Sequence, residues 1–203
     1  SDELLMNLDE LHGAYDNMDM ENIMAAIDQL SQNMEQVEQE LNRFLDILKR
    51  IQAEQMVQEI VERLEQLVTE QELLNNKIQK TNKETDLSKF PRLEQEENRN
   101  LEEFNNILDK MQKAKELMEK YSKSSSKAIE SLSESDLAKK TKSDLSDAVN
   151  ELGKQSSLSS QKSSASSLEN LKALHMQALN ILNNFQQETA SKNSNIIINN
   201  SQT

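Results

Sequence analysis

The stretch IMAAIDQLSQNMEQVEQELNRFLDILKRI, residues Ile23 to Ile51, decides the fold. Its apolar residues fall alternately four and three positions apart, at Ile23, Ile27, Leu30, Met34, Val37, Leu41, Phe44, Leu48 and Ile51. Because an α-helix turns once in about 3.6 residues, a repeat of about 3.5 residues places these side chains in one nearly straight stripe. The stretch therefore predicts a long helix whose apolar stripe contacts other helices, either of the same protein or of a partner.

The same pattern extends from about Met20 to Lys80, with one change of phase. After Ile51 a strict repeat would require apolar residues at Gln55 and Gln58. The apolar series instead resumes at Val57, Ile60, Leu64, Leu67, Leu74 and Ile78. A slip of this kind gives a helix different neighbours on its two sides. We therefore expect the packing to differ before and after residues 52–55.

The composition favours a helical protein with a thin core. Of 203 residues, 35% are hydrophobic and 3% aromatic, and the chain has 2 glycines, 1 proline and no cysteine. Few residues interrupt a helix, and strong helix formers are abundant. The lack of cysteine excludes disulfides and thiolate chemistry. No window approaches the ~20 apolar residues that a membrane-spanning helix needs.

The first 132 residues are predicted to form a long helical hairpin preceded by a short helix. The short helix runs from about Asp2 to His12, and Gly13 breaks it before the long helix begins. The segment TNKETDLSKFPR, residues 81–92, supplies a turn, and Pro91 suits the start of a helix. A third helix should run from Pro91 to about Leu132 and fold back antiparallel on the long one.

Residues 133–190 are predicted to form two shorter helices. Ser135 or Asp136 can cap the first, and Gly153 lies where a helix end favours left-handed backbone. The serine-rich run 156–167 is predicted to be a linker or a frayed helix start, because serine hydroxyls compete with the backbone for hydrogen bonds. Ser166 and Glu169 form a candidate capping box for the last helix. The polar tail 191–203 is predicted to be disordered. The last helix has its apolar face at Leu168, Leu171, Leu174, Ala178, Leu182 and Phe185.

The net charge of -13 is unevenly distributed. Residues 1–42 contain eleven carboxylates and no lysine or arginine, whereas residues 91–203 contain sixteen acids and fifteen bases. An acidic surface repels phosphates and anionic lipids, so the charge excludes nucleic acid as the expected partner. The acidic run is either a solvated face that keeps the protein soluble or a docking surface for a basic partner.

Residues that could perform chemistry are scarce. Gly13 and Gly153 stand alone, so no loop can hold a phosphate. His12 and His175 lack the partners of a metal site and are assigned as ordinary surface or boundary residues. Met18, Met20, Met24 and Met34 could fill gaps in packing, form an adaptable groove for a partner helix or hold Cu(I); packing is the preferred reading. The sequence predicts no catalytic, cofactor-binding or metal-binding residue, and no enzyme.

The sequence therefore predicts an all-α protein, an elongated antiparallel bundle with one very long helix. We expect a structural or protein-interaction module whose apolar stripe, the nine residues from Ile23 to Ile51, binds helices of itself or of a partner. The alternative is a chaperone-like or adaptor protein that presents its acidic, methionine-bearing N-terminal surface to a basic client. Homo-oligomers fit the first reading, and neither reading requires a cofactor.

The stretch RIQAEQMVQEIVERLEQLVTEQELLNNKIQK, residues 50–80, resembles a bacterial family of long helical, membrane-anchored proteins of unknown function. The features that carry the resemblance are Ala53-Glu54-Gln55, the leucine pattern after it and Glu70-Gln71-Glu72-Leu73-Leu74-Asn75. The preceding LHGAYDNMDMENIMAAIDQL is similar to the short-helix, Asp, long-helix pattern of that family. The resemblance covers the first half of the chain. It implies the soluble region of a larger envelope protein, and it implies no catalytic residue.

Overall fold

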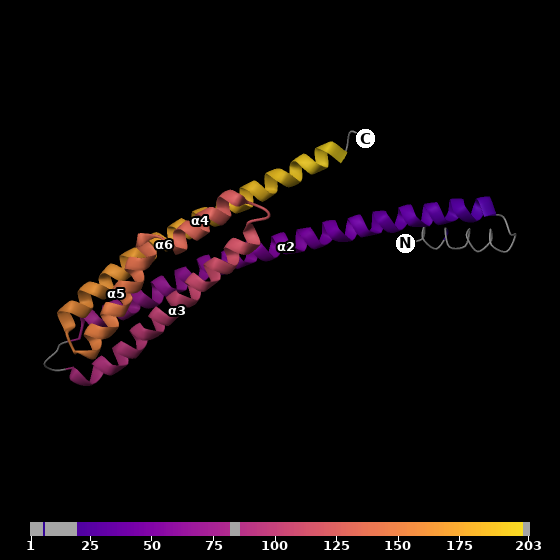
Figure 1. The fold of residues 1–203 in the computed structure, drawn as a ribbon. Coiled ribbons are helices and arrows are strands. Elements are labelled where there is room, and N and C mark those ends of the chain that lie inside the picture. The colour runs from indigo at the N-terminus through magenta and orange to yellow at the C-terminus, as the bar shows by residue number, and fades with distance from the viewer. Residues whose placement is uncertain (1–5, 7–19, 82–85, 201–203) are drawn as a thin grey trace. The chain divides into compact units, whose positions relative to one another are not determined.

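The computed structural model describes Met6, residues 20–81 and residues 86–200, and Figure 1 shows their arrangement. These residues are α-helical apart from short turns and one 3₁₀ turn, and no strand occurs among them. The chain divides into two compact units, residues 1–49 and 50–203, which are described separately below. Apart from Met6, which is helical, the short helix predicted at residues 2–12 lies outside the described residues.

The long helix α2 spans Met20–Gln79, as the apolar repeat predicted. In the second unit its buried side chains follow the resumed series, since Val57, Ile60 and Leu64 have no exposed surface. Burial begins within the phase slip: Ile51 is 40% exposed, whereas Ala53 and Val57 are 0% exposed. The expected difference in packing on the two sides of residues 52–55 is therefore confirmed by the burial of the side chains.

A helical hairpin joins α2 to α3, as the turn around Pro91 predicted. The 3₁₀ turn η1, Leu87–Lys89, leads directly into α3, Phe90–Met118, with Pro91 in its first turn. Ion pairs tie the two helices together along their length: Arg63 lies 2.7 Å from Glu103, and Lys110 lies 2.9 Å from Glu59. The buried side chains of α3 keep a strict heptad spacing and are Phe90, Leu93, Glu97, Asn100, Phe104, Ile107, Met111, Ala114 and Met118.

The helix predicted from Pro91 to Leu132 is in fact two helices. α3 ends at Met118, and α4 spans Lys123–Ser133 and packs against α3 and α6. Ser122 has extended backbone, and its hydroxyl accepts a hydrogen bond from the Ser125 N–H at 3.0 Å. The Ser122 hydroxyl thereby satisfies an N–H in the first turn of α4 that has no carbonyl partner within the helix, so a new helix begins here.

The next helix has the predicted N-cap at Ser135, but its predicted left-handed residue, Gly153, is not left-handed. α5 spans Asp136–Gly153, and the Ser135 hydroxyl accepts a hydrogen bond from the Ala138 N–H at 3.0 Å. Gly153 does not have positive φ; among the described residues Gln155 does, at 56°. A Cβ added at Gly153 would lie 3.1 Å from the Glu94 carboxylate, so this glycine allows a close approach to α3.

Of the two alternatives predicted for the serine-rich run 156–167, a linker or a helix start, the structure has the start of a helix. α6 spans Ser157–Asn200, and Ser160, Ser164 and Ser167 are completely buried in it. Serines are small enough for neighbouring helices to approach closely. The hydroxyls of Ser160 and Ser167 bond within α6, Ser160 to the Ser157 carbonyl and Ser167 to the Ser164 carbonyl, both at 2.9 Å.

Two predictions for α6 differ from the structure. Ser166 lies inside the helix and donates a hydrogen bond to Asp144 of α5 at 2.6 Å, so it is no cap. The helix continues to Asn200, through most of the tail predicted to be disordered. The predicted apolar face of the last helix is confirmed, because its six residues are all buried: Leu168, Leu171, Leu174, Ala178, Leu182 and Phe185.

The second unit is an all-α bundle of antiparallel helices (Figure 1). α4 and α5 are consecutive helices separated by a short break. This architecture confirms the predicted fold class. A large apolar cluster that includes Phe104, Ile107, Leu171 and Phe185 forms the main core. A smaller cluster lies near the hairpin and consists of Leu74, Ile78, Phe90, Leu93 and Leu152.

Candidate functional site

The predicted contact stripe lies on α2 and faces solvent in this structure. The side chain of Ile23 is outside the described part, and Leu30 is half-buried. The other seven stripe residues are exposed by 40% to 61%: Ile27, Met34, Val37, Leu41, Phe44, Leu48 and Ile51. The helix forms as expected, while the companion helix expected along this stripe does not appear among the described residues. Contiguous exposed apolar surface of this kind is typical of a binding site.

Leu45 and Ile47 extend the stripe on both sides, and the sequence reasoning missed them. They are 44% and 39% exposed, close to their neighbour Leu48. In the heptad that contains the stripe they occupy the two positions that flank the seam. That placement could have been read from the sequence, because both residues are apolar where residues 27–41 offer mostly polar or small ones at the same heptad positions.

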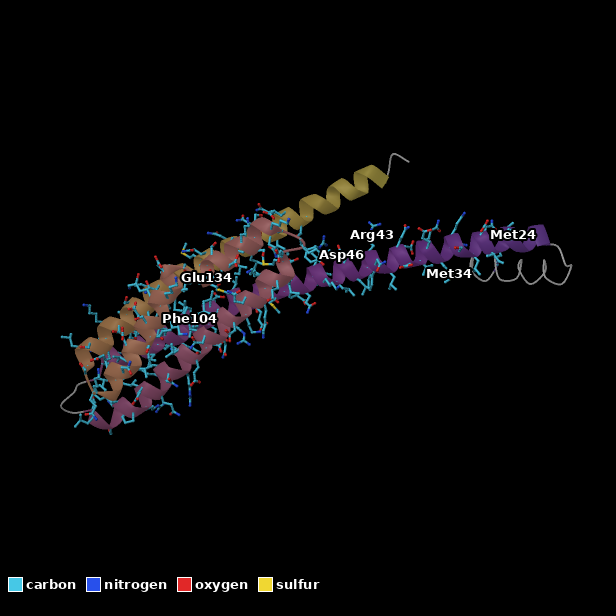
Figure 2. The ribbon with its side chains drawn as sticks, in the orientation of Figure 1. Met24, Met34, Arg43, Asp46, Phe104 and Glu134 are labelled. Carbon is cyan, nitrogen blue, oxygen red and sulfur yellow. The ribbon has the colours of Figure 1, made fainter. Side chains whose placement is uncertain are left out.

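The N-terminal half of the stripe lines an open hollow in the surface. Its walls are Ile27, Leu30, Ser31, Met34, Glu35, Val37, Glu38 and Leu41. Apolar side chains form most of the lining, and Glu35 and Glu38 supply negative charge. Met24 and Met34 are 64% and 61% exposed on the same helix, where Figure 2 labels them. The preferred reading of these methionines as packed residues is therefore not borne out among the described side chains.

A polar cluster is buried where the two apolar clusters of the second unit meet along α2 and α3. The Gln71 side-chain amide nitrogen donates to both carboxyl oxygens of Glu97, at 2.8 and 3.0 Å, and contacts the Ser164 hydroxyl at 3.0 Å. The Asn100 amide nitrogen donates to the Gln71 amide oxygen at 2.7 Å. Gln71, Glu97 and Ser164 have no exposed surface, and Asn100 is 4% exposed. Three helices are thus joined by one set of hydrogen bonds.

Glu97 is the one strongly perturbed acid in this cluster. Burial raises its pKa to about 7, and the hydrogen bond from Gln71 opposes this shift only in part. The carboxyl group accepts its hydrogen bonds from the neutral Gln71 amide. The sequence signal for the cluster was available: Gln71 fills the heptad position between Leu67 and Leu74, as Glu97 does after Leu93. Polar residues at such positions fix register and orientation in helical assemblies.

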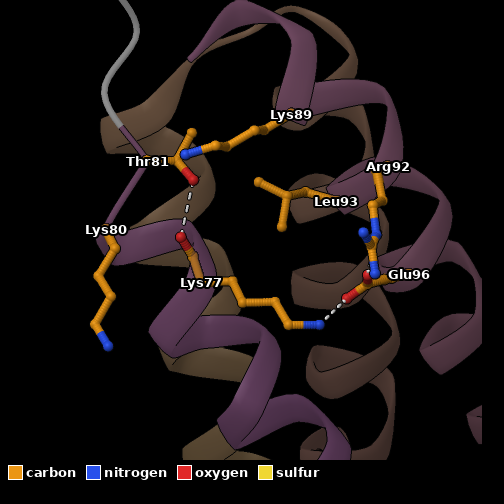
Figure 3. A pocket seen from close by; sticks show the side chains of 7 residues that line it. All are labelled: Lys77, Lys80, Thr81, Lys89, Arg92, Leu93 and Glu96. Atoms are coloured by element: carbon orange, nitrogen blue, oxygen red, sulfur yellow. Dashed lines mark hydrogen bonds and ion pairs between the residues drawn. The ribbon is translucent and has the colours of Figure 1, made fainter. Parts of the chain in front are cut away.

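A small basic pocket lies beside the hairpin (Figure 3). Its lining consists of Lys77, Lys80, Thr81, Lys89, Arg92, Leu93 and Glu96. Glu96 accepts from Lys77 at 2.6 Å and from Arg92 at 3.0 Å. Burial alone would raise the pKa of Glu96, but these two hydrogen bonds outweigh it and lower the pKa. The lining has four basic side chains and the single carboxylate of Glu96, so the pocket keeps net positive charge even though Lys89 also pairs with Asp86 at 2.8 Å.

The remaining candidate residues form no cluster in the described part of the chain. No group of three or more His, Asp or Glu side chains there could hold a metal ion. His12 lies outside the described residues, and His175 is a half-buried residue of α6. None of the helices searched, among residues whose placement is described, is both long and apolar enough to cross a membrane.

Comparison with protein families, with curated proteins and with solved structures gave no match for this chain. The interpretation of the candidate site therefore depends on its own residues. Among these features, the stripe on α2 is the main stretch of exposed apolar surface, and surface of this kind is usually covered by a partner.

Proposed function

We propose that this protein is a structural or interaction module that binds helices through the stripe on α2, either of itself or of another protein. The observation that carries the proposal is the exposure of a regular heptad of large apolar side chains from Ile27 to Ile51. Covering such a seam with a second helix removes apolar surface from water, at about 25 cal/mol per Å². The proposal assigns no catalysis, cofactor or nucleic acid to the chain.

The buried polar cluster supports a structural role, because it fixes one arrangement of the helices. Gln71, Glu97, Asn100 and Ser164 satisfy one another only when α2, α3 and α6 keep a single register. A misaligned pair would leave a carboxyl or amide group buried without a partner, which costs about 1–3 kcal/mol or more. A bundle with one fixed register holds the second half of α2 in one position against α3 and α6.

Chemical crosslinking of the purified full chain tests the proposal. Val37→Asp places a charge in the stripe, and Gln36→Asp places the same charge outside the stripe on the same helix. We expect Val37→Asp to abolish the crosslinks made by residues 27–48, whether to a second copy or to a partner, while Gln36→Asp retains them. Equal crosslinking of both variants and the unchanged protein would exclude the stripe as the contact surface.

One observation favours a second candidate, a chaperone-like or adaptor protein for basic clients. Met24 and Met34 are exposed, and residues 1–42 contain eleven carboxylates without a lysine or arginine. Methionine-rich surfaces adapt to different partners. Charge reversal of Glu35, Glu38 and Glu40 separates the two candidates. Loss of client binding together with strong weakening by salt favours the acidic surface, and dependence on Val37 favours the stripe.

A further inference from the structure

The pocket beside the hairpin has a charge opposite to that of the whole chain. The chain has 36 acidic and 23 basic residues, whereas four basic side chains and one acidic side chain line the pocket. Lys77 lies in the last turn of α2 and Lys80 just after it, Lys89 ends η1, and Arg92 lies in the first turn of α3. Positive charges gathered in this way repel one another, and a bound anion relieves that repulsion.

Two carboxylates hold part of this positive charge in place without cancelling it. Glu96 accepts a hydrogen bond from Lys77 Nζ at 2.6 Å and one from Arg92 Nε at 3.0 Å. Lys89 Nζ lies 2.8 Å from the Asp86 carboxylate. The four basic side chains of the lining against these two carboxylates leave two positive charges in excess. This excess equals the charge of one dianion.

N–H donors remain for such an anion. A guanidinium group has five N–H donors and an ammonium group has three. Arg92 uses its Nε–H for Glu96, and its terminal N–H groups make no hydrogen bond within the described part of the chain. The Lys80 ammonium has no hydrogen bond or ion pair with any residue that the structure describes. A guanidinium fork beside ammonium groups is the arrangement that proteins use to hold phosphate groups.

The pocket has room for more than a single ion. Its volume is about 370 Å³, within the range of roughly 300–1,000 Å³ that is typical of pockets for small molecules. Leu93 lies between the basic side chains and is 5% exposed, and Thr81 is 7% exposed beside it (Figure 3). The aliphatic stems of the lysines add further apolar surface. The lining therefore suits a ligand with an anionic group and a less polar remainder.

The charge and the donors favour the phosphate group of a monoester. Such a group carries a charge of about −1.5 to −2 at pH 7 and has three strong acceptor oxygens. A carboxylate carries half of that charge and has two oxygens. The sequence contains no glycine-rich loop that could hold a phosphate through backbone N–H groups, whereas this pocket supplies its donors from side chains.

We propose that this pocket binds the phosphate group of a phosphate monoester between Lys77, Lys80 and Arg92, with the rest of the ligand against Leu93. The phosphate oxygens accept from the terminal N–H groups of Arg92 and from the two ammonium groups. Because these residues come from both sides of the hairpin, the ligand ties the end of α2 to the start of α3 and stabilises the folded chain. The site lies in the second unit and does not depend on the stripe.

Isothermal titration calorimetry of the full chain with glycerol 3-phosphate tests the proposal. Arg92→Gln should raise Kd about tenfold or more, because it removes the guanidinium fork. The Arg92 side chain is 81% exposed, so this change should leave the fold intact. Arg92→Lys keeps the charge without the fork and should recover only part of the affinity. Lys139→Gln, which removes a 71% exposed charge from α5, is the control and should bind like the unchanged protein.

Two further titrations separate the proposal from simple attraction between charges and identify the source of the phosphate group. Acetate should bind about tenfold more weakly than glycerol 3-phosphate or worse, since it has less charge and fewer acceptors. Vesicles of phosphatidylcholine with phosphatidic acid offer the same group on a lipid. Binding to these vesicles and not to glycerol 3-phosphate, with loss of binding in Arg92→Gln, would keep the site and make a lipid headgroup its ligand.

Thermal unfolding provides an independent measurement. Glycerol 3-phosphate should raise the melting temperature of the unchanged protein and of Val37→Asp equally, and should leave that of Arg92→Gln nearly unchanged. The proposal is overturned if neither glycerol 3-phosphate nor the phosphatidic acid vesicles bind at millimolar concentration. Equal binding of acetate and glycerol 3-phosphate, or equal weakening by Arg92→Gln and Lys139→Gln, would also overturn it.

Discussion

At the scale of single residues, the buried carboxyl group of Glu97 controls how the stability of the bundle depends on pH. Glu97 has no exposed surface, and its folded-state pKa is raised from 4.5 to about 7. The folded chain therefore holds this proton more tightly than the unfolded chain does. Between these two pKa values the unfolded state binds fewer protons, so the free energy of unfolding falls as pH rises.

Glu97→Gln is expected to remove this dependence. The unchanged protein should lose on the order of 3 kcal/mol of unfolding free energy between pH 4.5 and about 7 through this residue. The glutamine variant has no proton to lose and should be the more stable protein at pH 8. Urea unfolding at pH 5 and pH 8 measures the difference. Glu102→Gln, an exposed position on α3, is the control and should leave the slope unchanged; an equal slope in Glu97→Gln would refute the assignment.

Gln155 is a second residue whose setting predicts a measurable effect. It has a φ of 56°, a left-handed conformation that costs a residue with a Cβ about 1–2 kcal/mol. Gln155→Gly should therefore stabilise the bundle by about 1 kcal/mol, although glycine loses more backbone entropy on folding. Thermal unfolding followed by circular dichroism gives the comparison.

Gly153→Ala is the matched control for that change. The sequence assigned the left-handed position to Gly153, in which case alanine would be strongly unfavourable there. In the structure its added Cβ meets only the flexible end of Glu94, at 3.1 Å. We expect a small change in melting temperature. A large decrease would mean that Gly153, and not Gln155, has the left-handed conformation.

At the scale of helices, the buried serines of α6 predict that size, more than polarity, matters at the start of this helix. Ser160 is completely buried, whereas Ser159 beside it is exposed. Ser160→Leu should cost about 1–3 kcal/mol through overpacking, and Ser159→Leu should cost little. Urea unfolding of the two variants provides the measurement. Equal stability of the two would mean that α6 begins later, as the sequence analysis supposed.

The helices show which signals in the sequence were sufficient. Apolar spacing predicted α2, its phase slip and the face of α6, because a heptad has one simple geometric meaning. Pro91 predicted the hairpin, because its ring suits the first turn of a helix. These features depend on the conformation of neighbouring residues in the chain, which a single sequence is enough to predict.

The failures have a common physical cause. Serine was read by its intrinsic preferences, which favour turns and linkers. In the structure Ser122 follows that preference and caps α4, whereas Ser160, Ser164 and Ser167 are buried in a helix because neighbouring helices leave room only for small side chains. Tertiary packing decides between these outcomes, and no local pattern distinguishes them. The place of Leu45 and Ile47 beside the stripe could be read from their heptad positions, but the burial of Glu97 depended on its partners in α2 and α6.

At the scale of the whole molecule, charge and apolar surface are both concentrated in the first part of the chain. Five of the eleven carboxylates before Asn42 lie on α2 together with the exposed stripe: Glu21, Asp28, Glu35, Glu38 and Glu40. If copies assemble through the stripe, salt screens the repulsion between them and the association constant should rise several-fold between low and physiological ionic strength. Docking of a basic client would show the opposite dependence. Sedimentation velocity at two salt concentrations distinguishes the two.

The most direct test of the central claim is amide hydrogen exchange along α2, in the unchanged protein and in Val37→Asp. An isolated stretch of helix opens easily, whereas a stretch covered by other helices is protected. We predict that residues 27–48 exchange slowly in the unchanged protein at high concentration and rapidly in Val37→Asp, while residues 53–78, whose seam is buried within the bundle, stay protected in both. Rapid exchange of residues 27–48 in both proteins would contradict the account.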